Sequence, residues 1–439
     1  MLVLDGQTGL LRATEVGVLL AVAAYPMLVS GLAWAFLRHG WPAGRASWTA
    51  LPLVVARPIM VLSLVVLATQ VPSDISANAP VYQDITPSVI CAARDVLQGQ
   101  DPYQTPELRC LRALDVPVAL ATPLRAGPFR DLATYPTVRQ ELAVEHTARA
   151  RGYQTGAFPI FGYPPLSFVW MLPAALGHRG SWALWTLIWA AAWLGVAGKL
   201  AGRWRPAVVL ILSLQWATGG ALGDAAQGNS EFFAVALLAL ALLLLDSPRL
   251  SALALGLAAA TSQIAWITLP GYLLLVRHLD NGRRRLWWLA GTVALTTLPW
   301  AVAYPAAPLA MWRLVVQPAY PLGIGLVALS SVSPLLPLLP KASYLAATAA
   351  AELVLLAVSL RSRESAALAV VLAPAALWFS WRSETSFLGL VLVLACAATV
   401  GLDRLEVADQ RRHGRTLPTS VLSACQAADA APRGDLRCS

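Results

Sequence analysis

The stretch Phe232–Leu245 reads FFAVALLALALLLL and contains no charged or amide side chain. Comparable apolar blocks occupy Val16–Leu37, Pro52–Val71 and Pro206–Leu222. Their lengths approach the roughly 20 residues that an α-helix needs to cross a bilayer. A transmembrane β-barrel would instead alternate apolar and polar residues. The pattern therefore predicts a polytopic, all-α membrane protein.

The composition of the chain leads to the same class. Of 439 residues, 57% are apolar and 13% are charged, against roughly half and a quarter in soluble domains. These proportions exclude a soluble enzyme. The net charge of +9 comes almost entirely from arginine, which we attribute to a GC-rich coding bias. The basic residues lie in short loops between apolar blocks, which excludes a nucleic-acid-binding domain.

The apolar blocks predict an order of membrane segments. The start of the chain lacks the features of a cleaved signal peptide, so we expect the first block to remain as a helix. Three blocks have an uncertain crossing: 160–176, 250–277 and 322–339. The other predicted spans lie at about 15–37, 51–71, 181–198, 206–222, 229–245, 286–304, 342–360, 366–381 and 386–402.

Arginine placement favours one topology over another. Short cytoplasmic loops are enriched in Lys and Arg, and all the dense basic connectors can be cytoplasmic if 250–277 forms two short helices meeting near Thr261–Gln263. The blocks 160–176 and 322–339 are then re-entrant or interfacial. In the alternative, each uncertain block crosses once and nearly all these connectors lie outside. The connectors are Lys199–Arg205, Arg277–Arg285, Arg361–Arg363 and the tail with Arg404, Arg411, Arg412 and Arg415.

The first topology places four polar segments on the outer side. They are 72–158, Gly220–Asn229, Ala306–Tyr320 and Trp381–Thr385. Polar residues gathered at one membrane face of a bundle indicate a functional site, so we expect the four segments to meet. The segment 72–158 is too long for a simple connector and should fold partly on its own.

The segment 72–158 contains a predicted helix. Thr86 and Pro87 resemble an N-cap and first helical residue, and an apolar stripe with helical spacing follows, which Gly99 ends. Asp84 lies just ahead of this helix and close to the membrane. Cys91 and Cys110 are the only cysteines of the segment, and an oxidising outer side would allow a disulfide between them. The sequence alone leaves that pairing open.

The chain divides into three predicted regions. Residues 1–50 form an additional transmembrane helix and a cytoplasmic connector, and 51–402 form the main membrane domain with its extracytoplasmic loop. Residues 403–439 are rich in Ala, Arg and Asp without a helical period, which predicts a disordered cytoplasmic tail.

Motifs of soluble enzymes are absent from the sequence. It has no phosphate-binding loop, no dinucleotide-binding fingerprint, no zinc-spaced Cys or His pair and no nucleophile elbow. Four of the five histidines lie in connectors or the tail, and only His146 lies in the outer loop. We therefore expect no metal and no histidine catalysis.

Outer carboxylates and amides remain as candidates for chemistry. Asp84 is the leading one, because apolar neighbours hold it near the bilayer ahead of a helix. Most other outer carboxylates are expected to be solvated. A second cluster, 219–229, contains Asp224, Gln227 and Asn229, and is either a flexible turn or a binding site.

Two further clusters allow a structural or a functional interpretation. Tyr163 precedes a proline pair that can simply kink the chain. Arg382 and Glu384 lie between apolar spans, where they can form a packing ion pair, or Arg382 can hold a lipid phosphate.

In chain order these pieces resemble glycosyltransferase family 87, the polyprenyl-phosphate-mannose-dependent α-mannosyltransferases with the GT-C membrane fold. The similar motifs are Asp84 followed by Ala92-Ala93, Leu97-Gln98-Gly99 and Pro102-Tyr103; Phe161-Gly162-Tyr163-Pro164-Pro165-Leu166; Gln227-Gly228-Asn229; and a helix pair leading to Arg277 and Arg285. The resemblance covers about residues 50–400. Gln263 stands where the family often has a lysine, and 381–384 departs from the late family motif.

The resemblance implies a GT-C-like bundle of about 11 to 13 membrane segments. It implies transfer of a sugar, expected to be mannose, from a polyprenyl-phosphate donor to a lipid or glycan acceptor, by inverting displacement at the extracytoplasmic side of the cell membrane. Asp84 is the implied general base, and no cofactor or essential metal is expected. Arg382 or Arg313 would contact the phosphate. The remaining implied donor or substrate contacts are Tyr163, Asp224, Gln227, Asn229, Gln263 and Glu384.

Two other functional classes use the same polar cavities. A lipid or glycolipid transporter or flippase would be expected to carry internal repeats with paired broken helices, and the sequence has no convincing repeat. A non-catalytic membrane partner protein is the third class, for which the long outer loop is the main support.

Overall fold

The structure of this chain is a computed structural model that describes part of the sequence, including most of the region 85–412. The described residues are 72, 75–76, 85–118, 120–121, 124, 129, 132–150, 161–202, 208, 225–226, 228–316, 322–323, 326, 340–380, 382–383 and 385–412. The predicted first two spans, and the predicted span at 206–222 apart from residue 208, lie outside these residues.

The described part is a helical bundle with one very short pair of strands. The helices are α3 (Ile85–Leu97), α4 (Leu108–Ala113), α5 (Val138–Ala150), α6 (Leu166–Ala175), α7 (Arg179–Ala201), α10 (Glu231–Leu243), α11 (Pro248–Thr261), α12 (Ile264–Arg277), α13 (Gly282–Ala303), α14 (Ala307–Val316), α16 (Lys341–Ser359), α17 (Arg363–Ala376), η4 (Leu377–Phe379) and α18 (Thr385–Arg412). The strand β1 (Leu322–Gly323) pairs in parallel with β2 (Arg382–Ser383), and apart from this short pair the elements of the described part are helical, as predicted.

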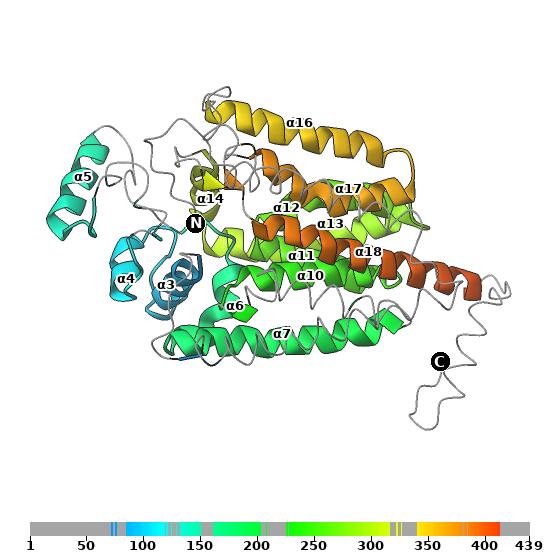
Figure 1. Cartoon of the computed structure of the whole chain (residues 1–439), viewed down its shortest axis with the longest axis horizontal. Coiled ribbons are helices and arrows are strands. Elements are labelled where there is room, and N and C mark those ends of the chain that lie inside the picture. Colours follow the sequence, from blue (N-terminus) through cyan, green and yellow to red (C-terminus); the bar gives the residue numbers. More distant parts are fainter. Residues whose placement is uncertain are drawn as a thin grey trace, which may run out of the picture.

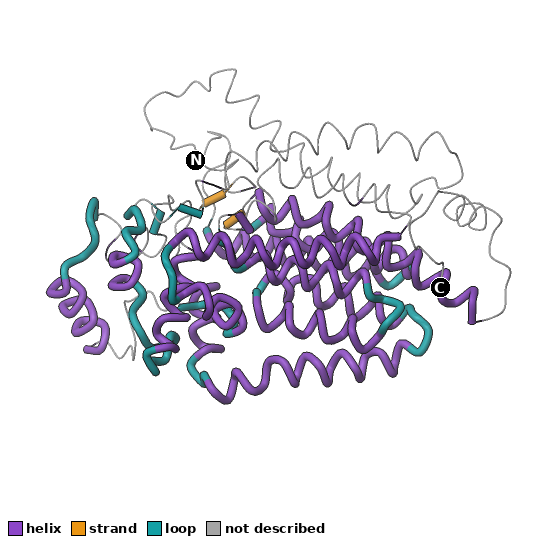
Figure 2. Tube along the Cα trace, turned by 90° about the horizontal axis from the view of Figure 1, so that it is seen from below, coloured by secondary structure: helices purple, strands orange, loops and turns teal. Residues whose placement is uncertain are grey.

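The long helices of the bundle run lengthwise beside one another (Figures 1 and 2). Three described helices are long and apolar enough to cross a membrane: α7, α13 and α16. The chain therefore has the helical, apolar character predicted for a membrane protein. The total number of membrane segments stays a prediction.

One end of the bundle, here called the basic end, gathers the predicted basic connectors. Arg404 of α18 donates to the Leu200 carbonyl at 3.2 Å and forms an ion pair with Asp246 at 2.7 Å. Arg285 donates to the Leu245 carbonyl at 2.6 Å. His278, after α12, lies 3.0 Å from the Ser359 carbonyl at the end of α16. The connectors predicted to share one side of the membrane therefore lie together.

The opposite end, here called the loop end, carries α3, α4, α5 and α14 (Figure 1). Arg94 of α3 donates to the Ala175 carbonyl at 3.0 Å and to the Gly177 carbonyl at 3.3 Å, just before α7 begins. The Thr186 hydroxyl in α7 donates to the Ala225 carbonyl, so residue 225 lies near the same end.

Two of the three blocks with an uncertain crossing can be compared with the structure. The block 250–277 forms two helices that break at Ser262, which is extended with φ −147° and ψ 147°. The helix α6 has 10 residues, too few for a span, and both of its flanks lie at the loop end. Of the block 322–339, only residues 322–323 and 326 are described, so its predicted path lies outside the described residues.

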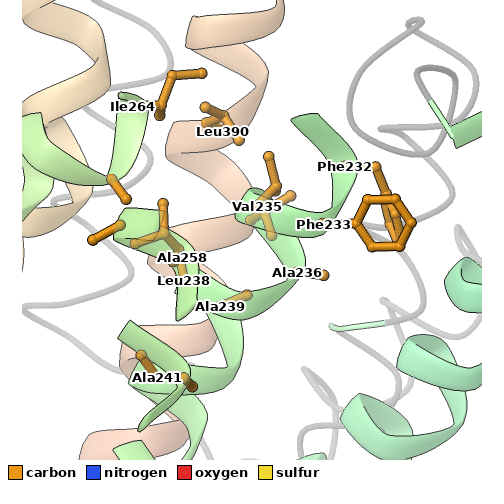
Figure 3. Packing of buried hydrophobic residues seen from close by; sticks show 14 of the residues in the cluster. Phe232, Phe233, Val235, Ala236, Leu238, Ala239, Ala241, Ala258, Ile264 and Leu390 are labelled. Carbon is orange, nitrogen blue, oxygen red and sulfur yellow. The ribbon is translucent and has the colours of Figure 1, made fainter. Parts of the chain in front are cut away.

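Small residues allow the central helices to approach closely. Figure 3 shows Val235 and Leu238 of α10 gathered with Ala258 of α11 and Leu390 of α18. A Cβ atom added at Gly401 of α18 would lie 1.9 Å from the backbone oxygen of Leu242 in α10. In a bilayer, such contacts stabilise a bundle through van der Waals packing. The hydrophobic effect does not drive helices together there, because lipid tails are as apolar as the helix surfaces.

Two predicted boundaries need correction. The tail was predicted to be disordered from residue 403, but α18 continues to Arg412. Leu405 is buried and Arg404 binds two other connectors, so tertiary contacts stabilise these turns. The helix α3 begins at Ile85, ahead of the predicted cap at Thr86. Pro87 is tolerated there because the first-turn N–H groups have no partner within the helix.

Candidate functional site

An aromatic cluster at the loop end joins three segments that are distant in sequence. Tyr103 lies after α3, Phe161 and Phe168 flank the start of α6, and Tyr304 follows α13. The Tyr103 ring centroid lies 5.5 Å from that of Phe161, 6.4 Å from Phe168 and 5.7 Å from Tyr304. Tilted contacts of this kind stabilise a cluster by about 0.5–1.5 kcal/mol per pair beyond burial.

Tyr103 is the centre of the cluster and carries its main polar contact. Its side chain is 1% exposed, and its hydroxyl donates to the Tyr163 carbonyl at 2.7 Å. Burial, with Tyr304 and Asp101 nearby, raises the Tyr103 pKa well above its usual range, so the phenol remains a proton donor. Burial also raises the pKa of Tyr304.

Asp101 shapes the turn that leads into Tyr103. Its carboxylate accepts the Tyr103 backbone N–H at 2.9 Å and the Gln104 amide at 2.7 Å. The turn follows Gly99, whose φ of +74° allows the left-handed conformation that ends α3. The predicted stop signal at Gly99 is therefore confirmed.

The break between α11 and α12 joins the same region. Gln263, at the break, donates through Nε2 to the Gly162 carbonyl at 2.8 Å. Trp170 of α6 donates to the Thr261 hydroxyl at 2.9 Å. The two predicted residues Tyr163 and Gln263 are thus brought together, because Gln263 bonds to the residue that precedes Tyr163.

Asn229 lies at the same end but is already engaged by its own helix. It is 2% exposed, and its side-chain oxygen accepts the Glu231 backbone N–H at 2.9 Å. Four residues later, Phe233 stacks on Trp170 with centroids 5.4 Å apart. Asn229 therefore binds the first turn of α10, while Phe233 makes the contact between α10 and α6.

The other predicted site residues are described only in part or not at all. Arg313 belongs to α14 and Arg382 to β2, but their side chains lie outside the description. The helix α14, which carries Arg313, lies at the loop end (Figure 1). Outside the described residues are Asp84, Asp224, Gln227 and Glu384. Asp84 directly precedes Ile85, the first residue of α3.

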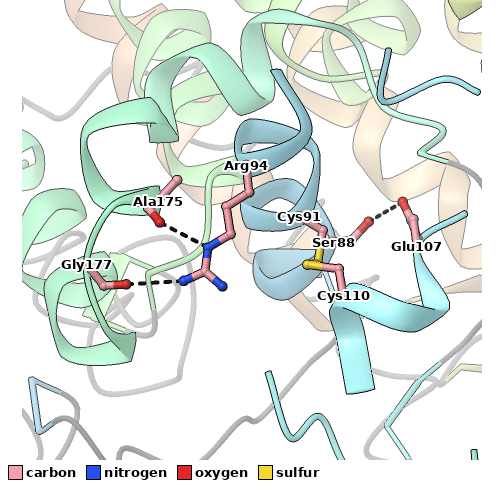
Figure 4. Close-up of a disulfide and its surroundings, with 7 residues drawn as sticks. All are labelled: Ser88, Cys91, Arg94, Glu107, Cys110, Ala175 and Gly177. Atoms are coloured by element: carbon pink, nitrogen blue, oxygen red, sulfur yellow. Dashed lines mark hydrogen bonds between the residues drawn. A yellow bond between two sulfur atoms is a disulfide. The ribbon is translucent and has the colours of Figure 1, made fainter. Parts of the chain in front are cut away.

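The helix α3 is clamped from two sides (Figure 4). Cys91 forms a disulfide with Cys110 of α4, with a Cα–Cα distance of 5.8 Å, so the pairing left open by the sequence is present. Beside it, the Ser88 hydroxyl donates to the buried Glu107 carboxylate at 2.7 Å. Arg94 makes its two bonds to the end of α6 on the other side. The start of α3, and hence the chain just after Asp84, is held against the bundle.

Two features of this region are not among the residues singled out from the sequence. The pKa of Asp95 is raised to about 6 by burial, while the sequence suggested only a solvated carboxylate. Tyr304 and Trp300, stacked with centroids 6.4 Å apart, extend the aromatic cluster along α13. The many tryptophan and tyrosine residues of the sequence are consistent with an aromatic cluster, but composition does not indicate which of them contact one another.

Among the described residues, no group of three or more His, Cys, Asp or Glu side chains could hold a metal ion. His146, the outer histidine, is exposed in α5. The described site contains hydrogen bonds made by Tyr, Trp and Gln side chains within an apolar, aromatic surround.

Comparison with known proteins returned no relative. No protein-family model, no curated protein and no solved structure matches this chain.

Proposed function

We propose that this chain is a membrane glycosyltransferase that transfers a sugar, expected to be mannose, from a polyprenyl-phosphate donor to a lipid or glycan acceptor. The observation that carries the proposal is the contact between motif segments. Tyr103 bonds to Tyr163 across 60 positions and Gln263 bonds to Gly162 across 101 positions. Three of the segments that carry the resemblance to glycosyltransferase family 87 are therefore neighbours in space.

The basic end supports an assignment of sides. Positively charged short loops favour the cytoplasm, and the basic connectors gather at one end of the bundle. The loop end then faces the extracytoplasmic side of the cell membrane. A disulfide at the loop end fits an oxidising compartment.

The proposed reaction is an inverting displacement. Asp84 takes the proton of the acceptor hydroxyl, whose oxygen forms a bond with the sugar C1 while the bond from C1 to the phosphate oxygen breaks. The polyprenyl phosphate leaves with the electron pair of that bond. Arg382 or Arg313 stabilises the phosphate charge. The other proposed contacts to sugar or phosphate are Tyr163, Asp224, Gln227, Asn229, Gln263 and Glu384.

The clamp on α3 supports the choice of Asp84 as the base. The Cys91–Cys110 disulfide and the Arg94 bonds hold the helix that begins directly after Asp84. Positioned general bases contribute about 10²–10⁴-fold to rate. The role of Asp84 is thus the part of the proposed mechanism most open to test.

The test compares Asp84→Asn with the wild-type chain in membranes supplied with labelled polyprenyl-phosphate-mannose. Asn keeps the size of the side chain but cannot take the proton, so transfer to lipid should fall about 10²–10⁴-fold while donor binding persists. Asp224→Asn is the matched variant and should weaken binding with a smaller loss of turnover.

Two outcomes would contradict the assignment. Wild-type transfer by Asp84→Asn together with loss in Asp224→Asn would exchange the roles of the two carboxylates. Absence of any sugar transfer by the wild-type chain would instead favour the transporter or partner-protein class.

A further inference from the structure

A polar cavity lies at the basic end of the described bundle, far from the loop-end site. It has a volume of about 430 Å³ and lies where α11 and α13 begin. Its lining includes Arg249 and Leu250 of α11, Arg284, Arg285 and Trp288 of α13, and Asp246 of the preceding connector. Three arginines thus face one carboxylate in a single cavity.

The lining of this cavity carries more positive than negative side chains. Asp246, the one lining carboxylate, is already paired with Arg404 at 2.7 Å. Arg285 is 7% exposed and is fixed by bonds to the Leu245 and Asp280 carbonyls at 2.6 and 3.0 Å. It therefore places a buried positive charge at the wall of the cavity.

The other two lining arginines, Arg249 and Arg284, are available to bind an anion. The Arg249 guanidinium lies 4.6 Å from the Trp288 ring centroid, which orients the charge without neutralising it. Arg284 is exposed and forms no ion pair within the described part of the chain. Two helix N-termini add to the field, since neither Ser247 nor Asn281 caps its helix with its side chain.

Exposed apolar side chains lie beside the cavity. Leu250, in the lining, is 54% exposed, and Trp287 on the adjoining turn is 70% exposed. The most apolar 18-residue window of α13 is only 6% buried within the protein. Lipid tails would therefore cover this helix face, and tryptophan is typical of the membrane interface.

We propose that this cavity binds the phosphate group of an anionic phospholipid from the leaflet at the basic end. The arginines and helix N-termini provide the charge that a phosphate requires. Leu250 and the exposed face of α13 provide a path for the acyl chains. A free phosphate could bind the same arginines, but it has no acyl chains to contact Leu250 and α13. The apolar path beside the cavity therefore favours a lipid as the ligand.

The test uses the purified full-length chain in a neutral detergent and measures its unfolding temperature against added lipid. Phosphatidylglycerol should raise the unfolding temperature in a saturable manner. Phosphatidylcholine and inorganic phosphate should give much smaller shifts at matched concentration.

Neighbouring arginines provide a charge-matched control. Arg284→Gln and Arg283→Gln each remove one charge from the same exposed turn, but only Arg284 lines the cavity. Arg284→Gln should weaken the phosphatidylglycerol affinity about 10-fold or more, because a charge-assisted hydrogen bond is lost. Arg249→Gln should do the same, and Arg283→Gln should change the affinity less than about 3-fold.

Three results would overturn the proposal. Equal losses in Arg283→Gln and Arg284→Gln would indicate diffuse surface attraction. Equal protection by inorganic phosphate would indicate an anion site without lipid specificity. Unchanged lipid affinity in both Arg249→Gln and Arg284→Gln would mean that the cavity is not the site. None of these results depends on sugar transfer, so the proposed function is tested separately.

Discussion

Asp95 of α3 carries a carboxylate whose pKa is raised by burial. Its pKa is raised to about 6 in the folded chain, against the ordinary value of 3.8. Between these two values the folded state holds a proton that the unfolded state releases. Stability therefore falls as pH rises through this window, and the loss is complete above the folded-state pKa.

Substitution of Asp95 by Asn should remove this dependence, because the amide has no charge to desolvate. Above about pH 7 the variant should unfold at a higher temperature than the wild-type chain, whose Asp95 has its pKa raised to about 6. Near pH 4 the two should unfold together. Thermal unfolding across this pH range would check the prediction, and parallel wild-type and variant profiles would contradict it.

Substitution of Tyr103 tests the hydrogen bond at the centre of the aromatic cluster. Tyr103→Phe keeps the ring contacts but removes the donor to the Tyr163 carbonyl. The free energy of unfolding should fall by about 1–2 kcal/mol, since a buried hydrogen bond is lost. Denaturant titration in detergent would measure the change.

Tyr304→Phe is the matched control for that substitution. Its ring belongs to the same cluster, but its hydroxyl forms no hydrogen bond among the described residues. We expect a change below about 0.5 kcal/mol. A loss equal to that of Tyr103→Phe would mean that the ring environment, rather than the bond to Tyr163, is responsible.

At the scale of elements, glycine positions decide how closely α18 can approach α10. A Cβ atom at Gly401 would lie 1.9 Å from the Leu242 carbonyl oxygen. Gly401→Ala must therefore separate the two helices, and we expect a loss of about 1–3 kcal/mol despite the better helix propensity of alanine. The free energy of unfolding in detergent would measure it.

Gly195→Ala in α7 is the counterpart of that variant. A Cβ atom there would meet no heavy atom within 4 Å. Alanine should then be neutral or stabilise the helix by up to about 1 kcal/mol. If both variants lost stability equally, the close approach of α18 and α10 would not be the cause.

At the scale of the whole molecule, the bundle has two chemically different ends. The side of the membrane on which each end lies can be measured. Gln98 at the loop end and Arg361 at the basic end are both exposed. In a chain that keeps only the Cys91–Cys110 pair, Gln98→Cys should react with an impermeant thiol reagent added to intact cells. Arg361→Cys should react only after the membrane is opened. The reverse pattern would invert the proposed topology.

The sequence by itself determined the helical class and several of the described elements. Apolar runs such as Phe232–Leu245 predicted helices because their composition is a local property, which the structure confirms for α10. Arginine spacing predicted that 250–277 would double back near Thr261–Gln263, and α11 and α12 do so. These features follow from chain composition and connector length alone.

Only the tertiary structure decided which distant side chains meet. The Tyr103, Tyr163 and Gln263 contacts join positions up to 101 residues apart, and no local pattern specifies such pairs. The same holds for the cavity of Arg249 and Arg284 and for the ordered turns of α18 after residue 403. Contacts of this kind depend on how several helices pack together, so their partners and burial become definite only in the folded bundle.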